Sequence, residues 1–343
     1  MSSETFRNKI KILGTKIERG SRVTLEFDVA KLHTRNSIKV PIFIERAQED
    51  GPVLLLLGGV HGDELNGVEI VRRIIRQKIN RPTRGTVIAI PVFNIFGFIN
   101  TSRSFPDGRD LNRVFPGSPK GSLASQFAHQ FREDIMPHVD YVIDFHAGGA
   151  DRVNVAQTRC LISDKKTYKL AKAFGAPFIV NSNFISKSIR KTFNDLGKPS
   201  LLFEGGKSML YDEAAIKYGV QGTKNVMRAL KMRKFRKRFE KKSVVIRKSK
   251  WLRAPYSGMF HVKVDNGSWV TKKTVMGIVT DPFGTFEKNI YAPFDCYVFC
   301  SNVSPIVNRG DAVFHVSVET GEKPKKKAKK KRLKSTKFKP EKK

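Results

Sequence analysis

The chain has 343 residues, of which 40% are hydrophobic, and its formal net charge is +34. No apolar run reaches the ~18–20 residues that would cross a bilayer. Residues 1–11 have no apolar signal core either, so we expect a protein that is neither membrane-embedded nor exported. The 3 cysteines are odd in number and lack CxxC spacing, which argues against a disulfide framework and a thiolate zinc site and favours the reducing cytoplasm.

The first two thirds of the chain alternate between strand-like and helix-like segments. Short β-like runs fill residues 10–46, among them 22–27 and 37–44. Buried strands are predicted at 53–60, 85–92, 139–145 and 200–203, and helices at 65–77, 122–135, 165–174 and 213–231. In the first helix, the side chains of Val68, Val71, Ile74 and Ile75 share one face. This alternation predicts an α/β domain, in which ligands gather beyond the strand ends.

The pattern changes in residues 251–319, which have no helical period. Short β runs are separated by turns, and the stretches that begin at Ala254 and Ala292 echo each other. A duplicated hairpin unit that forms a small all-β barrel or sandwich is the interpretation that this echo favours.

Two stretches hold most of the positive charge. Residues 228–250 carry 12 lysines and arginines against one acidic residue, and residues 322–343 carry 13 against two. Such blocks attract polyanions, for example an acidic protein tail or RNA, whereas the plainer alternative is a solvated, solubilising segment. We therefore expect a catalytic domain at 1–235, a basic linker at 236–250, a β domain at 251–319 and a Lys-rich disordered tail at 320–343.

Three residues with metal-binding side chains stand at predicted strand ends in glycine-rich turns. His61 and Glu64 lie three apart in GGVHGDE, and His146 ends the strand that runs into DFHAGG. A catalytic zinc site takes three protein ligands and leaves one position open, so these residues predict one zinc ion per chain. Asp144, two residues before His146 on the same side of the strand, could orient its imidazole.

Amide hydrolysis at such a site also needs a general base and fixed donors. Glu204, at the end of the apolar strand in LLFEGG, is the candidate that takes a proton from the attacking water and returns it to the leaving amine. The loop SRSFPDGRDLNRVFPG offers four donors for a carboxylate or a developing oxyanion. These donors are Arg103, Arg109, Asn112 and Arg113.

Together, GGVHGDE, DLNRVFPG, DFHAGG and FEGG resemble the succinylglutamate desuccinylase/aspartoacylase family of the zinc carboxypeptidase superfamily, over roughly residues 35–235. The resemblance implies a carboxypeptidase-like mixed sheet flanked by helices, with zinc on His61, Glu64 and His146. It implies that Glu204 is the catalytic carboxylate, that Asn112 and Arg113 grip a substrate carboxylate, and that Arg103 polarises the scissile carbonyl. Arg109 has no counterpart in the pattern. Residues 251–319 are similar to a lipoyl/biotinyl-like barrel, but the tip TDPFG holds no lysine to modify.

We therefore predict a zinc-dependent hydrolase that deacylates an N-acyl amino acid or a related small amide with a carboxylate. A first alternative is a zinc carboxypeptidase that trims acidic residues, such as glutamate, from a peptide or protein, which the net charge of +34 would suit. A second is a catalytically idle protein that binds RNA or ribosomes through its basic stretches. The acyl group and the oligomeric state are left open.

Overall fold

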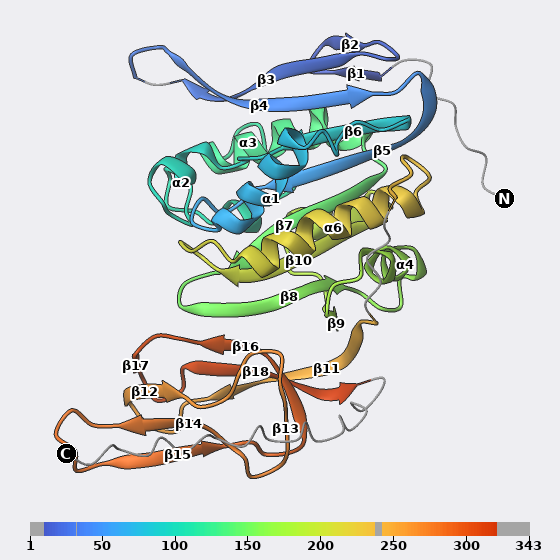
Figure 1. The fold of residues 1–343 in the computed structure, drawn as a ribbon. Helices are drawn as coiled ribbons and strands as arrows, with labels where there is room; N and C mark the ends of the chain where they lie inside the picture. Colours follow the sequence, from blue (N-terminus) through green and yellow to red (C-terminus); the bar gives the residue numbers. More distant parts are fainter. Residues whose placement is uncertain (1–9, 32, 237–241, 321–343) are drawn as a thin grey trace, which may run out of the picture.

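The structure is a computed structural model that describes residues 10–31, 33–236 and 242–320 (Figure 1). Its centre is a sheet of 12 strands in the order β13-β16-β18-β11-β9-β8-β10-β7-β5-β6-β4-β3. The strands up to residue 207 are β1 (Ile10–Ile12), β2 (Thr15–Ile17), β3 (Arg22–Lys31), β4 (Ser37–Arg46), β5 (Glu49–Gly58), β6 (Arg84–Ile90), β7 (Tyr141–Gly148), β8 (Arg152–Cys160), β9 (Phe178–Asn181) and β10 (Ser200–Lys207). Strands β6, β5, β7 and β10 run parallel, and β4 and β8 flank them antiparallel. The mixed sheet is therefore confirmed.

Helices cover both faces of this sheet, because the four leucines of β5 alternate between them. Leu54 and Leu56 pack beneath α1 (Leu65–Arg76), α4 (Lys165–Phe174) and α6 (Glu213–Ala229). Leu55 and Leu57 point to the opposite face, under α3 (Leu123–Asp134) and α5 (Ile189–Asp195). The remaining helices are α2 (Ile95–Ile99), η1 (Leu111–Arg113) and η2 (Met136–His138). A strand that is buried on both faces has apolar residues at consecutive positions, which explains the run of residues 53–57 in β5.

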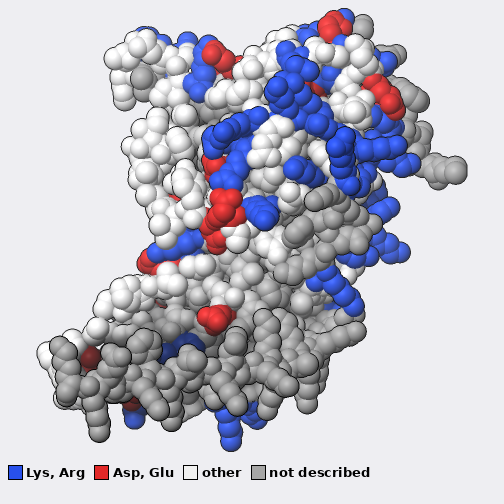
Figure 2. Space-filling view, viewed as in Figure 1, with Lys and Arg blue, Asp and Glu red and all other residues white. Residues whose placement is uncertain are grey.

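The predicted elements are confirmed, with small differences. In α1 the fully buried apolar side chains are Ile70, Val71 and Ile74, whereas Val68 and Ile75 are only partly buried. The strand β8 and the shorter elements α2, α5 and β9 had not been predicted. Among the described residues no helix is both long and apolar enough to cross a bilayer. Figure 2 shows many lysines and arginines over the upper half of the face that carries α1 and α6.

The C-terminal strands show the twofold pattern that the sequence echo predicts. They are β11 (Val244–Arg253), β12 (Gly258–Val262), β13 (Trp269–Val270), β14 (Val275–Thr280), β15 (Glu287–Tyr291), β16 (Cys296–Asn302), β17 (Ile306–Val307) and β18 (Ala312–Thr320). One group, β13-β16-β18-β11, ends the large sheet, and the other is a separate sheet, β15-β14-β12-β17. If β11–β14 are superposed on β15–β18, each pairing in one group maps onto a pairing in the other. Each sheet therefore takes two strands from each repeat.

The stretch expected to be a basic linker is partly a strand. Residues 244–250 belong to β11, which pairs in parallel with β9 and antiparallel with β18. The apolar run 244–246 supplies the β-forming side chains, and the lysines around it had masked this signal. As a result, the large sheet continues without a break from the first part of the chain into the second. Residues 237–241 of the expected linker, and the expected tail from 321 onward, lie outside the described residues.

Candidate active site

The loop between β5 and α1 carries His61 and Glu64, and its glycines shape it. Gly59 has a φ of +63°, in the left-handed region, and it turns the chain directly after the strand. A Cβ on Gly62 would lie 1.8 Å from the backbone carbonyl carbon of Gly97, so only glycine fits there. The loop can therefore fold back and bury both functional side chains, each of which is 2% exposed.

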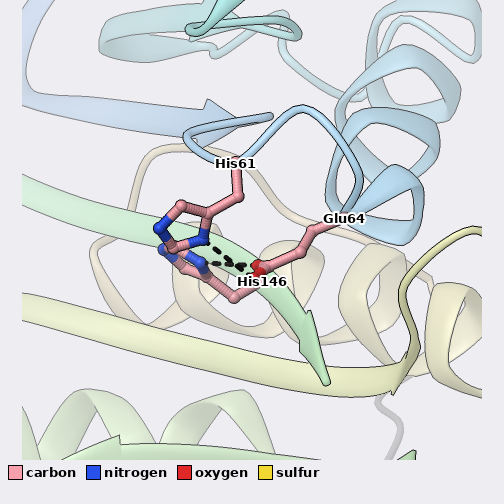
Figure 3. Close-up of side chains that lie close together, drawn as sticks. All are labelled: His61, Glu64 and His146. Carbon is pink, nitrogen blue, oxygen red and sulfur yellow. Dashed lines mark hydrogen bonds and ion pairs between the residues drawn. The ribbon is translucent and has the colours of Figure 1, made fainter. Parts of the chain in front are cut away.

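His146 lies on β7, the strand next to β5, and completes a group of three converging side chains (Figure 3). The Nδ1 atom of His61 lies 2.8 Å from Oε1 of Glu64. The Nδ1 atom of His146 lies 2.8 Å from Oε2 of the same carboxylate. One ligand atom from each of the three residues lies within 4.8 Å of those of the other two. Two imidazoles and one carboxylate in this arrangement can share a single ion.

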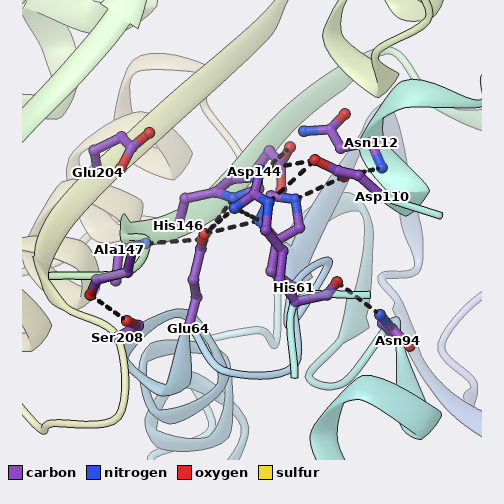
Figure 4. Close-up of polar contacts among 12 residues, drawn as sticks. His61, Glu64, Asn94, Asp110, Asn112, Asp144, His146, Ala147, Glu204 and Ser208 are labelled. Carbon is purple, nitrogen blue, oxygen red and sulfur yellow. Dashed lines mark hydrogen bonds and ion pairs between the residues drawn. The ribbon is translucent and has the colours of Figure 1, made fainter. Parts of the chain in front are cut away.

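Carboxylates on the outer side of each imidazole make the group suitable for a cation. Nε2 of His61 lies 3.1 Å from Oδ1 of Asp110, and Nε2 of His146 lies 3.0 Å from Oδ2 of Asp144 (Figure 4). Burial alone would lower the pKa of both histidines, but the surrounding carboxylates outweigh it and raise the pKa of each. Burial would likewise raise the pKa of Glu64, yet the two histidines hold it well below its ordinary value. Positive charge is thus favoured between the side chains, and a divalent ion fits this donor set.

Glu204 lies on β10, where its backbone is in register with His146 on the adjacent strand. Its Oε2 accepts a hydrogen bond of 2.8 Å from Nδ2 of Asn154, and Oε1 lies 3.6 Å from Nη1 of Arg159. In Figure 4 its carboxylate lies apart from the three converging side chains. Burial raises its pKa, against the opposing charge of Arg159. Its strand is therefore the neighbour of the strand that carries His146, and its carboxylate is held by side chains of β8.

Arg103 is the predicted donor that the structure brings closest to the group. Its Nη1 donates to Oε1 of Glu64 at 3.0 Å. Its Nε and Nη2 donate to Oδ2 of Asp110 at 3.1 and 2.9 Å. The guanidinium is thereby fixed between two carboxylates at the edge of the group.

The other three predicted donors lie further along the same loop. Asn112 is anchored, because its Oδ1 accepts a hydrogen bond of 2.9 Å from the backbone N–H of Ile189. The side chain of Arg113 is 41% exposed and donates to the backbone oxygen of Asn112 at 2.7 Å. Arg109 is 55% exposed, and its Nη1 lies 3.7 Å from Oδ2 of Asp107. Of these three, Arg113 also faces the carboxylate that holds Arg103, at 4.0 Å from Oδ2 of Asp110.

Sequence reasoning had missed the residues that hold the candidate catalytic side chains. Asp110 bridges His61 and Arg103, and its position inside the DLNR motif was the available signal. Asn154, which bonds Glu204, lies on a strand without a sequence motif. Arg190 is buried nearby, and burial together with the like charge of Arg159 lowers its pKa to about 10. The pairing of β8 with β10 is what brings Asn154 to Glu204.

Comparison with known sequences gives a family match and one partial relative. A sequence model of the succinylglutamate desuccinylase/aspartoacylase catalytic domain matches residues 50–230. The N-alpha-acetyl-L-2,4-diaminobutyric acid deacetylase of Halomonas elongata is 33% identical over 150 residues. That match spans 42% of this chain and 44% of the relative, which is less than half of its length.

Solved structures match over nearly the whole chain. A succinylglutamate desuccinylase/aspartoacylase from Rhodobacter sphaeroides has a TM-score of 0.75 at 24% identity, covering 87% of this chain and 95% of that one. The product-bound ectoine utilization protein EutE (DoeB) of Ruegeria pomeroyi has a TM-score of 0.76 at 24% identity, with the same coverages of 87% and 95%. A succinylglutamate desuccinylase from a Silicibacter species reaches 0.77 at 21% identity, over 92% and 98%. At these identities the matches establish the fold.

Proposed function

Because the chain belongs to the succinylglutamate desuccinylase/aspartoacylase family, we propose that it is a zinc-dependent amide hydrolase. Its substrate is an N-acyl amino acid or a related small amide that bears a carboxylate. The observation that carries the proposal is the convergence of His61, Glu64 and His146 within 4.8 Å. The deacetylase of Halomonas elongata, which shares 33% identity over 150 residues, supports amide hydrolysis.

Each polar side chain around the group has a part in this reaction. One zinc ion held by His61, Glu64 and His146 would supply a Lewis acid for the amide carbonyl and would acidify a water molecule. Glu204 takes a proton from the attacking water and passes it to the leaving amine, and its raised pKa brings it closer to neutral pH. Arg103, held by Asp110, donates hydrogen bonds to the carbonyl oxygen as negative charge develops on it.

The loop that follows supplies the contacts to the substrate carboxylate. Asn112 and Arg113 form the pair that binds it, because a guanidinium and an amide can both donate to its oxygens. Arg109 is a more distant donor on the exposed rim. Asp144 holds the ring of His146 in place, at 3.0 Å from Nε2.

Trimming of acidic residues from a peptide is the second candidate, and the charge distribution favours it. The same chemistry cleaves a peptide bond, and a net charge of +34 attracts an acidic chain more than a small molecule.

A hydrolysis screen with zinc-loaded protein tests both candidates. The panel contains N-acetyl, N-succinyl and N-formyl amino acids together with oligoglutamyl peptides, and amine release is measured. Glu204→Gln serves as the matched inactive control, since it keeps the size of the side chain and removes the base. Zinc-loaded protein with no activity above that of Glu204→Gln on any of these amides would contradict the proposal.

A further inference from the structure

A shallow cleft in the C-terminal part of the chain takes no part in the proposed reaction. It lies between β11 and β15 and has a volume of about 510 Å³. A shift of 38 residues, which carries Ala254 onto Ala292, also relates the two walls of the cleft. The equivalent positions in the two walls are Trp251 and Asn289, Leu252 and Ile290, and Arg253 and Tyr291. The cleft therefore lies where the two repeats face each other.

Both walls are edge strands. Within the described part of the chain, residues 248–253 of β11 pair only with β18, and β15 pairs only with β14. The backbone groups on the outer side of each strand therefore have no ladder partner. An exposed edge of this kind is where an extended peptide can add a strand, with its alternate side chains entering the adjoining pocket.

The side chains of the cleft select for an acidic occupant. Lys250 and Arg253 are exposed on β11, and Lys288 is exposed beside the cleft on β15. Tyr291 is 53% exposed at the rim, whereas Ile290 is buried at its base. The peptide could thus set carboxylates against the cations and apolar groups against the aromatic ring and the aliphatic base.

Arg152 adds one more positive charge next to Trp251 of the cleft. The guanidinium of Arg152 lies 5.3 Å from the ring centroid of Trp251. Register partners run across the sheet from Gly206 through Asn154, Cys300 and His315 to Trp251. This path from Gly206 to Trp251 crosses four strand spacings, which amount to about 20 Å. An extended peptide of about six residues spans that distance.

We propose that this cleft is a docking site for an extended acidic peptide, which pairs with the open edge of β11 and places carboxylates on the side of that strand that carries Lys250. Two free edges favour a peptide over a nucleic acid, since a nucleic-acid strand has no backbone ladder to complete. The site goes beyond the proposed hydrolysis and does not depend on it, because it is tested by binding alone.

Fluorescence anisotropy on the full-length protein tests the proposal, in about 0.15 M salt to limit background binding. The probe is a labelled peptide of four Glu-Val repeats. Lys250→Glu and Tyr291→Ser are each expected to weaken its binding by about tenfold or more. Lys169→Glu is the matched control, because Lys169 is exposed on α4, which covers a different part of the molecule. It should leave the affinity within about twofold.

Two further probes define what would overturn the proposal. A peptide with proline in place of valine lacks every second N–H, and its prolines fix φ near −65°, so it completes the ladder poorly and should bind at least about tenfold more weakly. Equal binding of the proline peptide, or an equal loss in Lys169→Glu, would show general charge attraction in place of docking. Oligouridylate that binds more tightly than the peptide and is equally sensitive to Lys250→Glu would identify a nucleic-acid site. Melting curves of the variants verify folding.

Discussion

His315 should make the stability of the C-terminal strands depend strongly on pH. Its ring stacks on Trp251 at a centroid distance of 4.3 Å, and the ring of Phe299 lies tilted against it at 4.4 Å. Its Nε2 lies 2.9 Å from the hydroxyl oxygen of Ser249, and Nδ1 has no hydrogen-bond partner among the described residues. Burial, with the positive charges of Arg159 and Arg152, lowers the pKa of His315 to about 3.

The sign and size of the effect follow from this shift. The unfolded chain binds a proton at His315 below about pH 6.5, whereas the folded protein does so only near pH 3. Its contribution to stability is therefore complete above about pH 6.5 and is lost as the pH falls toward about 3. At pH 5 the folded state should already be about 2 kcal/mol less stable than at pH 7.5, because 1.5 pH units correspond to about 2 kcal/mol.

Urea unfolding followed by tryptophan fluorescence measures this quantity, since the 2 tryptophans, Trp251 and Trp269, both lie in the C-terminal strands. The variant His315→Phe keeps an aromatic ring in the stack and removes the titrating group. Between pH 7.5 and 5, its free energy of unfolding should fall by about 2 kcal/mol less than that of the wild type. Identical pH dependence in both proteins would refute the argument, as would an imidazole that titrates near pH 6.5 in the folded state by NMR.

Three further outcomes concern the candidate active site. Asn154→Ala removes the 2.8 Å hydrogen bond to Glu204, so kcat should fall about 10- to 100-fold with little change in KM. An unchanged kcat in steady-state assays would contradict the role of Asn154 in positioning Glu204. Gly62→Ala places a Cβ 1.8 Å from the backbone of Gly97, and denaturant titration should show a loss of about 2 kcal/mol or more. Zinc should raise the melting temperature of the apo wild type by about 4 °C or more but leave His61→Ala unchanged, and elemental analysis should find about one zinc per chain only in the wild type.

Local sequence patterns were sufficient for the main elements and for three converging residues. The apolar run of β5 and the periodicity of α1 identify these elements, because burial on two faces or on one face leaves a pattern within a few residues. His61 and Glu64 are separated by one tight turn, and His146 lies two residues before the end of β7. Parallel strands bring such ends to the same edge of a sheet, so the convergence of the three side chains could be predicted.

The tertiary structure alone decided what holds these residues and how the two parts of the chain join. Asn154 meets Glu204 because β8 pairs with β10, and β11 extends the sheet because it pairs with β9. Pairing between distant strands depends on register and on which edge is free, and neither leaves a mark within a short window of sequence. The basic residues around 244–246 even concealed the strand there, since an edge strand can carry charge on its exposed side chains while its backbone completes a ladder.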